Sequence, residues 1–79
     1  MIDVRRWTWK LDVLKMTCVN EENKVVVRIN RKGKEIKGKV LDMSKELFWS
    51  IARQENGPKI VQEIVLAAEN EYCKANSGN

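Results

Sequence analysis

Apolar and polar residues alternate along two stretches of the chain, 25–29 and 36–40. The apolar-phase positions are Val25, Val27 and Ile29 in the first stretch and Ile36, Gly38 and Val40 in the second. Such alternation is typical of a β-strand that turns one face toward the core. A two-residue turn at Lys32-Gly33 would join the stretches as a hairpin, because glycine tolerates positive φ. The pairs predicted from this turn are Ile29 with Ile36, Val27 with Gly38, and Val25 with Val40.

A third stretch, 14–18, has the same phase. A turn at Asn20 to Asn23 would place it beside the central strand. The predicted pairs are Leu14 with Ile29, Met16 with Val27, and Cys18 with Val25. A slip of one residue would turn every side chain to the other face, so the agreement across two turns favours a three-stranded antiparallel meander over residues 14–41. Gly38 lies inside a strand, where glycine often marks the close approach of another element.

Two helices are predicted after the meander. The first begins at Asp42 or Ser44, either of which is a suitable N-cap. Its apolar face is expected to hold Leu47, Phe48 and Ile51, with Met43 beside it and Trp49 pointing away. The second runs from about Lys59 to Ala75 with one broad apolar stripe, which consists of Ile60, Val61, Ile64, Val65, Ala68, Tyr72 and Ala75. The sequence therefore predicts an α+β fold (β-β-β-α-α), with both helices packed on one face of the sheet and a frayed tail at 76–79.

Residues 2–13 fit two different structures. A strand is indicated by the alternation of Trp7, Trp9, Leu11 and Val13, which a bulge at Val13-Leu14 would join to the meander. A helix capped by Asp3 is indicated by the spacing of Val4, Trp7, Leu11, Leu14 and Cys18. We favour the strand, because Trp, Thr and Val have low helix propensity and high strand propensity. This segment would then form a protruding N-terminal arm of a single domain, 1–79.

The composition is that of a small globular domain. The chain has 79 residues, of which 43% are hydrophobic, so we expect one domain with a thin core. No apolar run approaches the roughly 18 residues that a membrane span requires. The start of the chain also lacks the apolar segment of a signal peptide. We therefore expect a cytoplasmic protein that does not bind a membrane.

Candidate catalytic and metal-binding groups are sparse. The chain has no histidine and two cysteines, Cys18 and Cys73, which we expect to be free thiols, with a disulfide between them as the alternative. The serines and threonines lack a histidine base and stand in no recognisable Ser-Lys motif, and the carboxylates are dispersed. We therefore expect a non-enzymatic binding module with no catalytic site, metal, cofactor or small-molecule substrate.

Positive charge is concentrated in the half of the chain that holds the strands. Residues 1–41 carry 11 Lys/Arg and 5 Asp/Glu, a net charge of +6, whereas residues 42–79 carry 4 and 6, a net charge of −2. The predicted register turns several of these cations to the outer face of the sheet, and others cap the hairpin. The candidates for binding nucleic acid or another polyanion are Lys15, Arg28, Arg31, Lys32, Lys34, Lys37 and Lys39. This face carries no aromatic residue, so stacking of single-stranded bases on the sheet is not expected.

As architecture alone, a three-stranded sheet followed by a helix resembles the sheet-reading DNA-binding domains of some transcription factors and integrases.

The three tryptophans support a second hypothesis, in which the protein binds another protein. Trp7 and Trp9 either cap the core of their own chain or anchor an interface, and Trp49 is the candidate for an outward anchor. The alternative function is therefore a protein–protein interaction or homo-oligomerisation module, with an acidic protein or a second copy of the chain as its partner.

Overall fold

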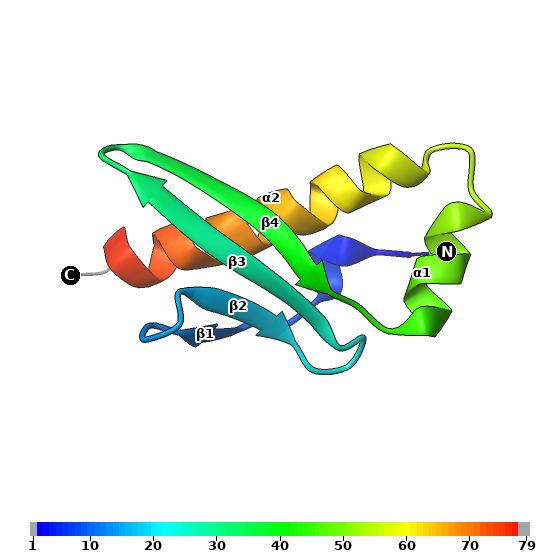
Figure 1. Ribbon diagram of the computed structural model, residues 1–79, viewed down its shortest axis with the longest axis horizontal. Helices are drawn as coiled ribbons and strands as arrows, with labels where there is room; N and C mark the ends of the chain where they lie inside the picture. Colours follow the sequence, from blue (N-terminus) through cyan, green and yellow to red (C-terminus); the bar gives the residue numbers. More distant parts are fainter. Residues whose placement is uncertain (1, 78–79) are drawn as a thin grey trace.

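The computed structural model describes residues 2–77, with side chains for residues 2–75 (Figure 1). The elements are η1 (Val4–Arg6, one 3-10 turn), β1 (Lys10–Asp12), β2 (Thr17–Asn20), β3 (Val25–Lys32), β4 (Glu35–Asp42), α1 (Lys45–Ala52) and α2 (Gly57–Ser77). The strands form one antiparallel sheet in the order β1-β2-β3-β4. Helix α2 crosses one face of this sheet, and α1 packs against α2 beyond the end of β4 (Figure 1). The predicted α+β class, with an antiparallel sheet followed by two helices, is confirmed. The expectation that both helices pack on one face of the sheet was wrong, because only α2 does so.

The sheet has four strands, so the prediction of three was wrong. Residues 10–12, expected in a protruding arm, form β1 and pair with β2, so that Leu11 lies opposite Cys18. The region 7–18 therefore holds one short strand, residues 10–12, and the start of another at Thr17, joined by a turn, and not one strand with a bulge. A turn and a bulge both shift the phase of the alternation, so the pattern alone does not distinguish them.

The turn at residues 13–16 explains the position of Leu14. The Asp12 carboxylate accepts a hydrogen bond from the Lys15 N–H (Oδ1–N 3.1 Å), and Met16 takes a φ of 52°, so the chain reverses here. Leu14 is 97% exposed in this turn, and its expected pairing with Ile29 was wrong. The Ile29 N–H instead donates to the carbonyl of Met16 (2.8 Å).

The observed register differs from the predicted one by two residues in both hairpins. The observed pairs include Cys18 with Val27, Val27 with Val40, and Ile29 with Gly38. A shift by two residues keeps every side chain on its face, because the side chains of a strand alternate with a period of two. The predicted inner face of the central strand is therefore confirmed, and Val25, Val27 and Ile29 are buried.

The position of the β3–β4 turn explains the shift in that hairpin. The turn residues are Gly33 and Lys34, and not Lys32 and Gly33. Gly33 has a φ of +60°, whereas Lys34 is not among the residues with positive φ. This is the pattern of a type II′ turn, which needs glycine at its first central position. The predicted turn would have needed a lysine there.

The core lies between the inner face of the sheet and α2. Its buried residues include Cys18, Val25, Val27 and Ile29 from the strands and Ile60, Ile64, Ala68 and Tyr72 from α2, which confirms the main positions of the predicted helical stripe. Helix α1 begins after the N-cap Ser44, whose Oγ accepts a hydrogen bond from the Leu47 N–H (3.2 Å). Helix α2 ends at Ser77, and the other two residues of the predicted frayed tail, 78–79, lie outside the described residues.

Gly38 lies at a close approach between β4 and α2. A Cβ atom at this position would lie 3.0 Å from Val65 Cγ1, 3.1 Å from Val27 Cγ1 and 3.3 Å from Glu69 Cγ. The expectation that another element crosses the strand at Gly38 is therefore confirmed, and the element is α2. A second contact joins the helix to β2, where the buried Cys18 Sγ donates a hydrogen bond to the carbonyl of Ala68 (3.5 Å).

A buried asparagine ties the N-terminal segment to the β2–β3 turn. Asn20 is fully buried at the end of β2. Its Nδ2 donates to the carbonyl of Thr8 (3.0 Å), and its Oδ1 accepts from the backbone N–H of Asn23 (2.9 Å). Buried polar groups need such partners, so these bonds allow an amide in the core and hold residues 8 and 23 beside β2.

Replacing Gly38 with alanine should lower the free energy of unfolding by about 1–3 kcal/mol, because the new methyl group would lie 3.0 Å from Val65 Cγ1 and 3.1 Å from Val27 Cγ1, and both side chains would have to shift. Urea denaturation followed by circular dichroism measures this change. In a double-mutant cycle, Val65→Ala removes the nearest methyl group, so Gly38→Ala should cost less in that background. Equal costs in the two backgrounds would contradict the close approach of α2.

Burial raises the pKa of the Cys18 thiol from 9.0 to about 11, and the Glu71 carboxylate adds to the effect. Between these pH values the unfolded chain loses this proton while the folded chain keeps it. The free energy of unfolding should therefore fall as the pH rises, by roughly 2–3 kcal/mol. Urea unfolding across this range measures the fall. Cys18→Ala should remove most of this fall. Cys73→Ala removes an exposed thiol and should leave the fall unchanged. An identical fall in the parent and in both variants would disprove the assignment of the effect to Cys18.

Candidate polyanion-binding surface

The sheet face opposite α2 is the candidate surface. Helix α2 covers the inner face, and no helix among residues 2–77 covers the outer one (Figure 1). The strand alternation turns Arg28 and Asn30 of β3 to the outer face, together with Lys37 and Lys39 of β4. The register pairs Arg28 with Lys39 and Asn30 with Lys37, and all four side chains are exposed. These four residues, called the cation block below, place three cations and an amide side by side.

A notch beside the cation block brings together three of the predicted cations. It lies between the β1–β2 turn and β3, and it has a volume of about 270 Å³. The residues that line it are Lys15, Arg28, Asn30 and Arg31, with the apolar Leu14, Met16 and Ile29. The Arg31 Nε donates to the carbonyl of Gly33 (3.2 Å), which leaves its terminal N–H groups for a ligand. With Lys15, Arg28 and Arg31 among its lining residues, the notch is positively charged, which suits an anionic group.

The remaining predicted cations lie at the tip of the β3–β4 hairpin. The paired residues of β2 and β3 end at Thr17 and Arg28, whereas β3 and β4 continue to the pair Lys32–Glu35. The outer part of the hairpin is therefore a two-stranded ribbon, with Lys34 in its turn. A ribbon of this kind is narrow enough to enter the major groove of a duplex.

Within the residues that the structure describes, no ion pair joins a carboxylate to the cation block. Within the part of the chain that the structure describes, ion pairs join Asp3 to Arg5 and Arg6, and Glu21 to Lys10. The Lys10 ammonium lies 2.7 Å from the Glu21 carboxylate, and this hydrogen bond raises the pKa of Lys10. None of these pairs includes a residue of the block, so its charge is available to an anionic partner.

The tryptophans occupy two different environments. Trp7 and Trp9 are half-buried and pack against the core of their own chain. Their rings are tilted against each other with centroids 5.9 Å apart. Trp49 is instead 59% exposed on α1. The interface hypothesis therefore stays a prediction that rests chiefly on Trp49.

The expected position of Phe48 on the core face of the first helix was wrong. Phe48 is 53% exposed, and its ring meets Trp49 edge to face, with centroids 5.5 Å apart. It also lines a hollow of about 350 Å³ with Leu41 and Lys45. Helix α1 buries only one side, and Phe48 lies about 100° around the helix from the buried Leu47. The sequence signal for an exposed apolar group beside this hollow is Leu41, which follows the inward-facing Val40 in β4 and therefore faces outward.

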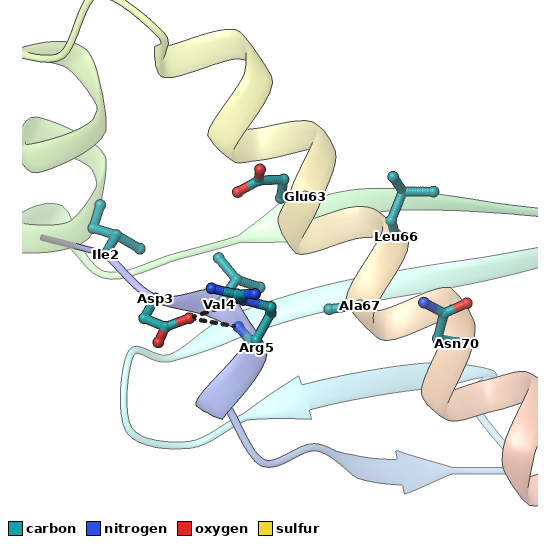
Figure 2. Close-up of a pocket in the computed structure, with 8 residues that line it drawn as sticks. All are labelled: Ile2, Asp3, Val4, Arg5, Glu63, Leu66, Ala67 and Asn70. Atoms are coloured by element: carbon teal, nitrogen blue, oxygen red, sulfur yellow. Dashed lines mark hydrogen bonds and ion pairs between the residues drawn. The ribbon is translucent and has the colours of Figure 1, made fainter.

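A groove between η1 and α2 has a different chemistry (Figure 2). It has a volume of about 480 Å³, and it is lined by Ile2, Asp3, Val4 and Arg5 on one side and by Glu63, Leu66, Ala67 and Asn70 on the other. Asp3 and Arg5 partner each other, because the Asp3 Oδ1 accepts from the Arg5 N–H (3.3 Å) and lies 3.6 Å from its Nε. None of the predicted site residues lines this groove, and Glu63 makes its rim unfavourable for a polyanion.

Comparison of the chain with protein-family models, with curated proteins and with solved structures found no match. Among the described residues, no group of three or more His, Cys, Asp or Glu side chains is placed to hold a metal ion. In the same part of the chain, no helix combines the length and the apolar character needed to cross a membrane.

Proposed function

We propose that this protein is a non-enzymatic, cytoplasmic module that binds nucleic acid through the outer face of its sheet and its β3–β4 hairpin. The observation that carries the proposal is the cation block, whose side chains are exposed on a face without a covering helix. Within the described residues no acid pairs with them. The phosphates of a nucleic-acid backbone complement such a surface in charge and in hydrogen bonding.

The regular spacing of the block favours nucleic acid over an acidic protein. Its two cross-strand rows, Arg28–Lys39 and Asn30–Lys37, are two residues apart along each strand, which is roughly 7 Å. The surface therefore presents donors at regular intervals, as a phosphate backbone presents acceptors. The notch lined by Lys15 and Arg31 adds donors at the edge of the block. Because donors of this kind bind phosphate groups, which are the same for every base, binding should depend strongly on salt and only weakly on base sequence.

The triple variant Arg28→Gln, Lys37→Gln, Lys39→Gln should lose affinity for an oligonucleotide by at least about tenfold at low salt. It should also show a shallower dependence of affinity on salt, by about one unit of the logarithmic slope for each phosphate that is no longer neutralised. Fluorescence anisotropy with a labelled oligonucleotide measures both quantities. A parent protein that ignores single-stranded and duplex DNA and RNA at low salt would rule out the proposal.

The matched control is the variant Arg5→Gln, Arg53→Gln, Lys59→Gln, which removes the same net charge from exposed positions off the outer face. Its affinity should change much less than that of the block variant, because its cations lie on η1, at the C-cap of α1 and on α2. Equal losses in the two variants would mean that net charge alone governs binding. That result would contradict a site on the sheet.

A further inference from the structure

Two aromatic side chains of α1 are more than half exposed to solvent. Phe48 is 53% and Trp49 is 59% exposed, although they contact each other. Helix α1 is anchored to the core by Leu47 and Ile51, which are both buried, so the rings are not needed for that purpose. Large exposed aromatic groups are costly in water and are typical of binding surfaces.

The rings adjoin the end of the outer sheet face. The register shifts between the pairs Val27–Val40 and Val26–Asp42, which leaves Leu41 as an extra residue of a β-bulge. Leu41 is 53% exposed and has the outward phase of Lys39, two positions earlier. Phe48 shares a hollow with Leu41, so the aromatic pair continues the surface that carries the cation block.

Lys45 adds a cation to this aromatic end. Its side chain lines the same hollow as Phe48 and Leu41, and within the described residues no carboxylate pairs with it. Along β4 the surface therefore changes from lysines at 37 and 39 to an apolar residue at 41. It then reaches the hollow, where Lys45 and the Asp42 carboxylate both lie beside Phe48. A ligand that follows this path must offer negative charge along its length and flat apolar groups at one end.

We infer that the ligand of this surface is single-stranded nucleic acid, with phosphates on the cation block and an unpaired base stacked on Phe48 or Trp49. This inference rests on the proposed function. A single strand offers both chemistries, because its bases are free to stack on aromatic side chains. In a duplex the base faces are already stacked, so the rings would stay in water. The strands themselves carry no aromatic residue on the outer face, and the stacking groups come from the helix that follows β4.

The test compares three labelled probes of about 15 nucleotides by fluorescence anisotropy: a thymidine strand, a strand of the same length with abasic sites, and a duplex. The thymidine strand should bind about tenfold more tightly than the abasic strand, which has the phosphates but no bases. Phe48→Ala and Trp49→Ala should each lose most of this preference while leaving the salt dependence unchanged. Trp49→Phe should retain most of it, because a ring is kept.

The matched control is Leu66→Ala, which truncates an apolar side chain of similar exposure (50%) on α2. It should bind the thymidine strand as the parent does. Thermal melts should show that all variants fold, since each substituted side chain is at least half exposed.

Four outcomes would overturn the inference, and one of them also overturns the proposed function. Equal affinity for the thymidine and abasic strands, or tighter binding of the duplex, would leave a phosphate-binding protein without base stacking. A sedimentation experiment in which Trp49→Ala dissolves a dimer without changing thymidine binding would assign the rings to contacts between copies. Binding of none of the probes at low salt would remove the inference and the proposed function together.

Discussion

Helix α2 lies so close to the inner face of the sheet that a Cβ atom at position 38 would lie 3.0 Å from Val65 Cγ1, and this packing decides which surface stays free. The hydrogen bond from the Cys18 thiol to the carbonyl of Ala68 holds the same helix against β2. Because one long helix covers one face, the opposite face keeps its lysines and arginines in solvent. The charged surface is therefore a consequence of how the core is packed, and a helix displaced to the other face would bury it.

The alternation of residues was enough to predict the two faces of the sheet, but not the position of the turns. Side chains repeat every two residues in a strand, so a register error of two leaves Val27 and Ile29 in the core. The position of the β3–β4 turn depends on whether glycine is its first or its second central residue. Gly33 can be followed by Lys34 or preceded by Lys32, and the sequence allows both turns. The first strand was ambiguous for another reason. The phase shift between Leu11 and Leu14 is produced equally by a bulge and by a turn, and only the observed hydrogen bonds separate the two.

The cations of the site were predicted because their phase in the strands is clear. Arg28, Lys37 and Lys39 alternate with apolar residues whose burial is certain once the core is placed. Trp49 was predicted to point outward, but Phe48 was not, because a helix of eight residues has too few turns for its pattern to show which of Leu47, Phe48 and Ile51 is turned outward. The notch at Lys15 was not predicted, because it lies between the β1–β2 turn and β3, and the pattern predicted a bulge in place of that turn. Asn20 was missed as a core residue because a buried amide is recognisable only from its partners.

The most direct measurement is a titration of the ¹⁵N-labelled protein with a single-stranded oligonucleotide, followed by NMR. The three tryptophan indoles are built-in reporters, since Trp49 lies beside the proposed surface and Trp7 and Trp9 pack against the core. We predict shifts at the amides of Arg28, Lys37 and Lys39 and at the indole of Trp49, with small changes at the other two indoles. Shifts concentrated at Leu66, Ala67 and the residues of η1 would place the ligand in the groove beside α2 and disprove binding on the outer face of the sheet.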